Sequence, residues 1–171
     1  MLITNHVVGG ALIGSVAPGP ASAFALGIAS HVAMDALPHW GHPDYDLFIK
    51  VAVVDGLVGL ATMATLARAT SPERRAAVVA GMLGACFPDA DKPSTLFFGG
   101  SPFPAWVDEV HKRIQNEAHE RMPCEALGGL VGAFLVRALL RRRSPREANP
   151  LRLPNVARAS SALVGGSTQP D

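Results

Sequence analysis

The chain is short of charge, of aromatic side chains and of cysteine, and each shortage excludes something. Charged residues make up 17% of the 171 residues and the formal net charge is +1, whereas roughly a quarter of an average soluble domain is charged. With 6% aromatic residues as well, the sequence has neither the basic surface nor the stacking platform of a nucleic-acid-binding protein. Cys86 and Cys124 are too few for a disulfide framework. We expect both to be small buried hydrophobic residues.

Strand patterns and a cleavable leader are also missing. The N-terminal MLITNHVVGG has no Lys or Arg ahead of its apolar run, so a signal peptide is not expected. Hydrophobic residues make up 49% of the chain, and Ala, Val, Leu and Gly are typical of closely packed helices. The sequence predicts an all-α, compact bundle of about five to six helices over residues 1–143. Residues 144–171, rich in Pro, Ser, Gly and Asn, are predicted to be a disordered tail.

Capping residues and prolines divide the bundle into its helices. Pro38 and Pro88 end two apolar segments, and Ser71 with Pro72 is typical of a helix start. The predicted helices cover residues 6–16, 23–37, 47–68, 72–87, 105–122 and 125–143.

The apolar helices raise the question of a membrane. Residues 51–67 are long enough to cross most of a bilayer but contain Asp55, and residues 125–140 would span only about 24 Å of a roughly 30 Å core. Charges nevertheless sort to opposite helix ends: Arg68, Arg74, Arg75 and residues 141–143 at one, and His39, Asp89 and Asp91 at the other. The positive-inside rule makes the basic ends cytoplasmic. We therefore expect a membrane-embedded or membrane-associated bundle, with a soluble bundle of strongly buried helices as the alternative.

The stretch SHVAMDALPHW, residues 30–40, places three metal-ligand side chains four residues apart. Positions four apart on a helix share a face, so His31 and Asp35 would present an imidazole nitrogen and a carboxylate oxygen to one divalent cation. Pro38 ends the helix and leaves His39 on the turn, free to fold back toward the same ion. The alternative is a helix-end cluster, with His39 stabilising the C-terminus and His31 bonded to Asp35.

Other polar residues stand where a cation would stabilise them. His6 begins the first helix, and Asp55 interrupts the apolar run VAVVDGLVGL, where an unpaired carboxylate is costly. Asp89 and Asp91 follow a helix end whose dipole opposes negative charge. His111 lies on a charged amphipathic helix. We expect His31, Asp35 and at least two of the residues His6, His39, Asp55, Asp89 and His111 to meet in one cluster.

Each of these residues also has an ordinary structural interpretation. Asp55 would hydrogen-bond to a neighbouring helix, and Lys92 would compensate the two aspartates before it. His111 and His119, eight residues apart, would be incidental on a solvated helix. Glu117 is one general-base candidate on that helix, but it points in a different direction from His111.

Three of these stretches, NHVVGGALIG, SHVAMDALPHW and PDADKPS, resemble signatures of a family of bacterial membrane-bound metal-dependent hydrolases. That family is associated with the inner membrane and is distantly similar to zinc-dependent phospholipase C. The resemblance covers about residues 4–140 and implies the metal residues His6, His31, Asp35, Asp89 and Asp91. Two features depart from the family pattern. The S-H-x3-D element precedes P-D-x-D here instead of following it, and HKRIQNEAH is only a loose counterpart of an H-R-G-x-T-H-S stretch.

The hypothesis is therefore a metal-dependent hydrolase of the inner membrane, whose metal site lies at one end of a helical bundle. The resemblance suggests a phosphoester substrate, either a small molecule or a lipid. One or two Zn2+-type ions would act, the first held by His31, Asp35 and His39, and the second by His6, Asp89 and His111. Asp55 would be a ligand or the catalytic base, and Asp91 belongs to the ligands that the resemblance implies.

Two alternatives belong to other classes of protein. A non-catalytic integral membrane protein would use the polar or metal cluster to hold its helices together. A small ion-handling transporter would use Asp55 as an intramembrane carboxylate, which would line a path and not join the cluster of His31. In both readings membrane lipid is the expected partner.

Overall fold

The computed structural model describes the backbone of residues 1–143 and the side chains of residues 1–138. The predicted disordered tail, residues 144–171, lies outside the described residues. The helices are α1 (Ile3–Val16), α2 (Pro20–Asp35), α3 (Tyr45–Ala69), α4 (Pro72–Cys86), α5 (Asp91–Phe98), α6 (Ala105–Ile114) and α7 (Met122–Arg143). Two 3-10 turns, η1 (Phe87–Ala90) and η2 (His119–Arg121), and two short strands, β1 (His39–Trp40) and β2 (Glu117–Ala118), complete the described chain. The all-α class predicted from the sequence is confirmed.

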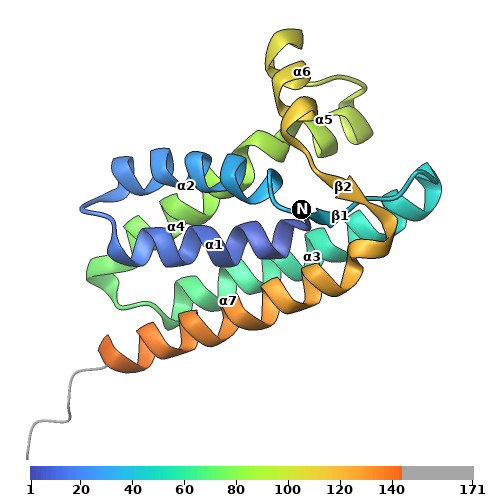
Figure 1. The fold of residues 1–171 in the computed structure, drawn as a ribbon. Helices are drawn as coiled ribbons and strands as arrows, with labels where there is room; N and C mark the ends of the chain where they lie inside the picture. Colours follow the sequence, from blue (N-terminus) through green and yellow to red (C-terminus); the bar gives the residue numbers. More distant parts are fainter. Residues whose placement is uncertain (144–171) are drawn as a thin grey trace, which may run out of the picture.

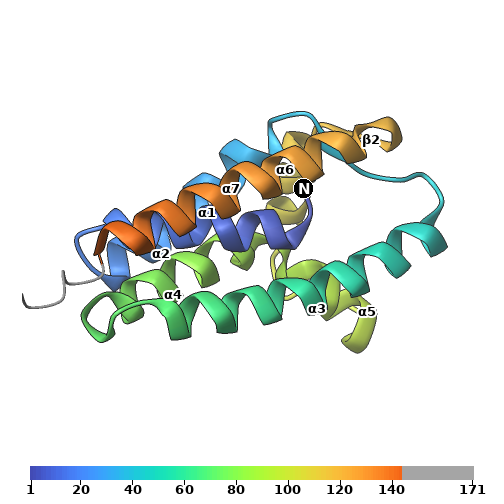
Figure 2. The same cartoon turned by 90° about the horizontal axis from the view of Figure 1, so that it is seen from below.

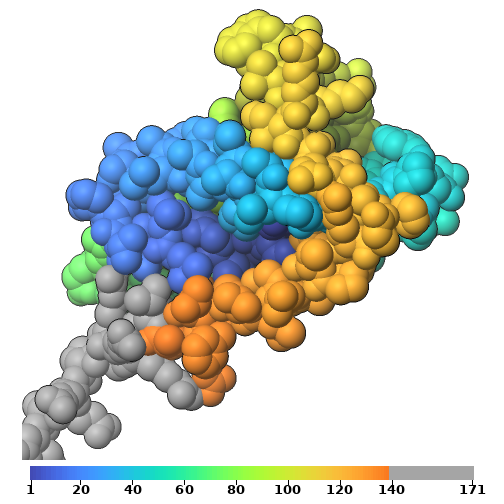
Figure 3. Space-filling view, viewed as in Figure 1, coloured from blue at the N-terminus to red at the C-terminus, as the bar shows by residue number. Residues whose placement is uncertain are grey.

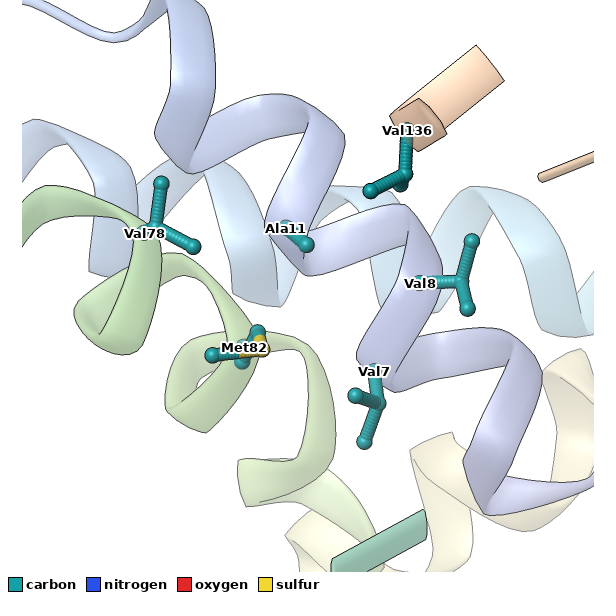
Figure 4. Close-up of a cluster of buried hydrophobic side chains, with 6 residues drawn as sticks. All are labelled: Val7, Val8, Ala11, Val78, Met82 and Val136. Atoms are coloured by element: carbon teal, nitrogen blue, oxygen red, sulfur yellow. The ribbon is translucent and has the colours of Figure 1, made fainter. Parts of the chain in front are cut away.

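Helix α1 lies at the centre of the bundle, and α4 packs most extensively against it and against α2. The core side chains come from three helices that are distant in sequence (Figure 4): Val7, Val8 and Ala11 of α1, Val78 and Met82 of α4, and Val136 of α7. These side chains are small apart from Met82, so the helices approach closely and the core is narrow.

Glycines allow α1, α2 and α4 to approach backbone to backbone. A Cβ at Gly10 would stand 2.7 Å from Met82 Cα, and one at Gly27 would stand 2.8 Å from Ala85 N. Both distances are shorter than van der Waals contact, so no larger residue fits without moving a helix. The glycines of these helices therefore form the contact surface that allows α2 and α4 to lie close together.

The two ends of the bundle carry different charged residues. The N-terminus, the ends of α2 and α4, and the pair β1–β2 gather at one end of the bundle, where α5 and α6 stand out from the body (Figures 1 and 3). The α3–α4 connection and the end of α7 lie at the opposite end. Arg68, Arg74 and Arg75 are therefore remote from His31 and Asp89, as the charge pattern predicts.

The predicted helix over residues 105–122 is wrong in its second half. Helix α6 ends at Ile114, and residues 117–118 pair in parallel with residues 39–40, where no strand was expected. The chain turns because Asn116 N donates to Asp35 O (3.0 Å) and His39 N donates to Asn116 O (3.1 Å). These long-range hydrogen bonds outweigh local helix propensity.

Helices α3 and α7 flank α1 on two sides (Figure 2). Leu57 and Leu60 of α3 and Leu130 and Phe134 of α7 are each more than 60% exposed. Among the described helices, α3, with 25 residues, is the one that is long and apolar enough to cross a membrane. Length and composition alone are weak grounds for membrane insertion.

Candidate metal centre

Helix α2 supplies two neighbouring side chains of the site. His31 and Asp35 lie one turn apart near its C-terminal end, and both are fully buried. The distance from His31 Nε2 to Asp35 Oδ2 is 3.0 Å. The i, i+4 spacing read from the sequence therefore places a nitrogen and an oxygen side by side, as a helix face requires.

Two further side chains arrive from distant parts of the chain. Asp89 comes from η1, directly after α4, and His111 comes from α6. Their ligand atoms and those of His31 and Asp35 all lie within 4.8 Å of one another, and all four residues are buried. The structure thus brings together four of the residues that the sequence pattern selected.

The spacing of these atoms fits a tetrahedral ion. His111 Nε2 lies 3.0 Å from His31 Nε2 and 3.2 Å from Asp35 Oδ2. Asp89 Oδ1 is farther away, at 3.6 Å from His111 Nε2 and 4.0 Å from His31 Nε2. Ligands about 2.0–2.2 Å from a zinc ion stand roughly 3.3–3.6 Å apart at the corners of a tetrahedron. His31, Asp35 and His111 therefore form a compact face, and Asp89 is a looser fourth corner.

Hydrogen bonds orient the ligands from outside this cluster. His31 Nδ1 lies 2.7 Å from Ala85 O, and because a carbonyl only accepts, Nδ1 carries the proton. This hydrogen bond turns Nε2 toward the cluster, where it can serve as a ligand atom, the orientation that metal-binding histidines adopt. The fixed imidazole is a feature of the fold, since α4 supplies the carbonyl.

The second oxygen of Asp35 faces away from the three-ligand face. Asp35 Oδ1 lies 3.1 Å from His6 Nε2 and 2.9 Å from the amine of Met1. Burial would raise the pKa of Asp35, but hydrogen bonds from His111, His31 and His6 outweigh it and hold the pKa well below its usual range. The carboxylate is therefore ionised, as a metal ligand must be.

His6 is buried beside the cluster. Its ring stacks on that of His31 with centroids 4.1 Å apart, and burial is the main reason that its pKa is lowered. His6 Nδ1 is buried and has no hydrogen-bond partner among the described side chains and backbone. The predicted division into two ligand sets differs from the structure: Asp89 and His111 lie with His31 and Asp35 in one cluster, and His6 contacts that cluster through Asp35 Oδ1.

Lys92 pairs with Asp89, one of the four residues of the cluster. Its ammonium group pairs with Asp89 Oδ1, three residues earlier in the chain. Burial would raise the pKa of Asp89, but Lys92 together with His6 and His31 outweighs burial and lowers that pKa. The compensating role that the sequence allowed for Lys92 is present in the structure, beside the metal-ligand geometry and not in place of it.

His39 lies outside the cluster, although the sequence hypothesis made it a ligand of the first ion. It is fully buried, and its Nδ1 donates to Leu37 O (2.8 Å). Its Nε2 faces Glu117 Oε1 at 3.6 Å. The β1–β2 pairing turns this side chain toward β2, so Pro38 does not fold it back onto α2.

Asp55 and Asp91 are also not brought to the ligand atoms. Asp55 Oδ2 accepts from Thr4 N (3.3 Å), the helix-to-helix hydrogen bond that was the ordinary alternative. It lines an open groove of about 600 Å3 between α1, α3 and α7. Asp91 starts α5, and its Oδ1 is buried without a hydrogen-bond partner in the described part of the chain.

The cysteines take no part in the cluster. Both are free, Cys86 half-buried and Cys124 exposed, so the expectation that both are buried is wrong for Cys124. Burial, and then the charges of Asp89 and Asp55, raise the pKa of Cys86 to about 12. A protonated thiol is a poor metal ligand.

Sequence reasoning missed Gln115 and the buried Glu125. With its amide nitrogen donating to Glu117 Oε1 (3.2 Å), Gln115 places its oxygen 3.3 Å from His111 Nε2. Glu125 Oε2 accepts from Asn5 Nδ2 (2.6 Å), and its Oε1 accepts from Trp40 N (3.1 Å). The i, i+4 spacing of His111 and Gln115 was the available signal for the first. For Glu125, which ties α7 to α1 and β1, the sequence carries none.

The chain was compared with protein-family models, with curated proteins and with solved structures, and it matches none of them. The interpretation of the cluster therefore rests on its own geometry.

Proposed function

We propose that this protein is a metal-dependent hydrolase whose divalent ion, of the zinc type, is held by His31, Asp35 and His111, with Asp89 as a looser fourth contact. The observation that carries the proposal is the buried face of two imidazole nitrogens and one carboxylate oxygen, 3.0–3.2 Å apart. Two imidazole nitrogens and an ionised carboxylate at this spacing can share one divalent cation once the nitrogens give up their protons. The residues present thus fit the ion by number, type and spacing.

The ligand set also leaves room for a reaction. A catalytic zinc site has three protein ligands and one position for water. His31, Asp35 and His111 supply three, while Asp89 is farther away and paired with Lys92. When bound, the ion would polarise a substrate oxygen and acidify a water molecule. A phosphoester substrate is proposed by resemblance only, and a second ion beside His6 and Asp35 Oδ1 belongs to the same proposal.

A membrane location is part of the proposal. It is supported by the exposed apolar side chains of α3 and α7 and by the length of α3. The arginines at the α3–α4 connection would face the cytoplasm of a bacterial inner membrane. The metal centre, at the opposite end of the bundle, would then face away from the cytoplasm.

A structural metal centre is the second candidate, and the burial of the four ligands favours it. Asp35 and His31 are fully buried, and a closed site with four protein ligands holds a fold together without chemistry. In that case the metal would stabilise the chain against unfolding, and no hydrolysis would depend on it.

Metal content tests the binding half of the proposal. Protein purified without chelator should carry about one to two equivalents of divalent metal per chain, measured by plasma mass spectrometry. His31→Ala should lose most of it, because the compact face loses one corner. His119→Ala is the matched control, since His119 is an exposed histidine outside the cluster. A wild-type protein that is metal-free and takes up neither zinc nor manganese would falsify the proposal.

Hydrolysis of p-nitrophenyl phosphate and bis(p-nitrophenyl) phosphate separates the two candidates. A hydrolase should lose turnover with the metal and regain it when zinc is restored. A structural centre should show a lower unfolding temperature after chelation and no turnover in any state.

A further inference from the structure

A short backbone segment, residues 115–118, leaves α6 and lies beside Asp35 of the cluster; it is called the strap below. Residues 115–118 follow α6, which carries His111, and Asn116 N donates to Asp35 O at the end of α2 (3.0 Å). Arg121 donates to Asn116 O (2.7 Å) and to Asn116 Oδ1 (2.6 Å), which holds the strap from its other side. The backbone of this strap is therefore fixed relative to two of the metal ligands.

The strap carries a carboxylate that the proposed ligand set does not use. Glu117 Oε1 accepts from the Gln115 amide nitrogen (3.2 Å), and the oxygen of the same amide lies 3.3 Å from His111 Nε2 and 3.2 Å from Lys92 Nζ. One amide group thus separates Glu117 from a ligand atom. Gly41 leaves room for this arrangement, since a Cβ there would stand 2.6 Å from Glu117 Oε2.

His39 faces Glu117 from the opposite side. Because His39 Nδ1 donates to Leu37 O, the ring is fixed, and its Nε2 points to Glu117 Oε1 at 3.6 Å. That Nε2 atom is buried and has no hydrogen-bond partner among the described groups. A buried imidazole nitrogen without a hydrogen-bond partner needs an explanation, and a role in positioning the neighbouring Glu117 carboxylate provides one.

Glu117 also differs from the ligands in exposure and charge. Its side chain is 36% exposed, whereas those of His31 and Asp35 are fully buried, so Glu117 is open to solvent. Its pKa is lowered first by His39, and also by the chain's amino terminus and Lys92, which together outweigh burial. An ionised carboxylate that solvent reaches, one amide group away from a ligand atom, can accept a proton from water.

We propose that Glu117 is the general base of the metal centre, and that His39 and Gln115 are its positioning residues. The inference rests on the hydrolase function proposed above. Glu117 takes one proton from a water molecule at the open side of the cluster while the water oxygen forms a bond to phosphorus. The bond from phosphorus to the leaving oxygen breaks, and Glu117 returns the proton to that oxygen. Water is the only co-reactant, and the carboxylate is regenerated.

The test uses Glu117→Gln in the full chain, with Glu120→Gln as the matched control. Glu120 is three residues away, 66% exposed and paired with His119 outside the cluster. Metal content is measured first, followed by turnover of bis(p-nitrophenyl) phosphate from about pH 3 to pH 9, because the lowered pKa of Glu117 places the acid limb below its ordinary value. Glu117→Gln should keep the metal, lose about 100-fold or more in kcat, and lose the acid limb of the pH profile. Glu120→Gln should match the wild type.

A readout that needs no turnover is the visible spectrum of the Co2+-substituted protein followed over pH. If Glu117 faces the open position, Glu117→Gln should move the spectral transition by about one pH unit or more, and His39→Asn should move it in the same direction by less.

The outcomes separate this inference from the function on which it rests. Turnover that survives Glu117→Gln overturns the role of Glu117 and leaves the hydrolase intact. A spectral shift in a protein that hydrolyses neither phosphate ester supports the placement of Glu117 and counts against the phosphoester substrate. A spectrum that is identical in wild type and Glu117→Gln, or a wild type that takes up no metal, overturns the inference.

Discussion

At the scale of single residues, the two carboxylates of the cluster, Asp35 and Asp89, differ in the partners that hold them. Asp35 is held from both sides, by His31 and His111 on one oxygen and by His6 on the other. Asp89 has one strong partner, Lys92, which is itself 36% exposed. If the cluster binds a metal ion as proposed, Asp89 would be shared between the ion and the ammonium group of Lys92, and a movement of Lys92 would change the number of ligands.

Lys92→Met should therefore tighten metal binding. The substitution keeps most of the apolar stem but removes the charge that competes for Asp89 and repels a cation, so we expect about tenfold higher zinc affinity. Competition against a chromophoric chelator measures the effect. Lys50→Met removes the same charge from α3, away from Asp89, and should leave the affinity unchanged. Weaker zinc binding by Lys92→Met would show that Lys92 supports the ligands and does not compete with the ion.

At the scale of elements, the approach of α1, α2 and α4 decides whether the ligands meet. Asp89 and His31 lie in the same cluster because α4 ends where α2 ends, and the two helices touch through backbone atoms at Gly27 and Gly84. On the other side, Gly10 of α1 faces Gly81 of α4. A side chain at any of these contacts would separate the helices and spread the cluster.

Gly81→Ala tests this contact. A Cβ at Gly81 would overlap Gly10 O and stand 2.9 Å from Gly14 N. We expect a loss of about 3 kcal/mol in the free energy of unfolding, the upper range of overpacking costs, together with weaker zinc binding. Urea denaturation in detergent measures the first, and chelator competition the second.

Gly56→Ala provides the control on α3. A Cβ at Gly56 meets nothing within 4 Å, so the better helix propensity of alanine should stabilise the protein by about 0.5–1 kcal/mol. Equal effects of the two substitutions would mean that the α1–α4 contact is looser than the structure shows.

At the scale of the whole molecule, the bundle has a narrow core and a wide apolar exterior. Helices α3 and α7 present Val54, Leu57, Leu60, Leu130 and Phe134 to the outside, each more than 60% exposed. Water solvates such a surface poorly, and patches of this kind mark interaction or membrane surfaces. The proposed occupant of this exterior is lipid hydrocarbon.

Replacing Val54, Leu57 and Leu60 together by serine should release the protein from membranes. Each side chain contributes about 1.5–3 kcal/mol when buried in hydrocarbon, so vesicle binding should fall by on the order of 100-fold or more. Co-sedimentation with phospholipid vesicles measures the loss. Serine at Leu96, Phe97 and Phe98 of α5, which are also exposed, should have little effect. A wild type recovered as a soluble, monodisperse monomer would remove the membrane part of the proposal.

The part of the cluster that lies within one helix could be predicted from the sequence. Helical periodicity alone places His31 and Asp35 on one face of α2, and Pro72 starts α4 as its fixed geometry predicts. Position in the sequence pattern made His6, Asp89 and His111 candidates, Asp89 because its carboxylate follows a helix C-terminus, without showing which partner each would have. Composition likewise identified the helical class, since small apolar residues favour closely packed helices.

Which of these residues lie together depends on long-range contacts of the folded chain. His111 is 80 positions from His31, and it reaches the cluster because Asn116 N bonds to Asp35 O and stops α6 at Ile114. The same turn directs His39 to Glu117 and away from the ligands, although His39 is the nearer neighbour in sequence. Local propensities act over a few residues, whereas these contacts depend on backbone hydrogen bonds and helix approaches that close only when distant segments have packed.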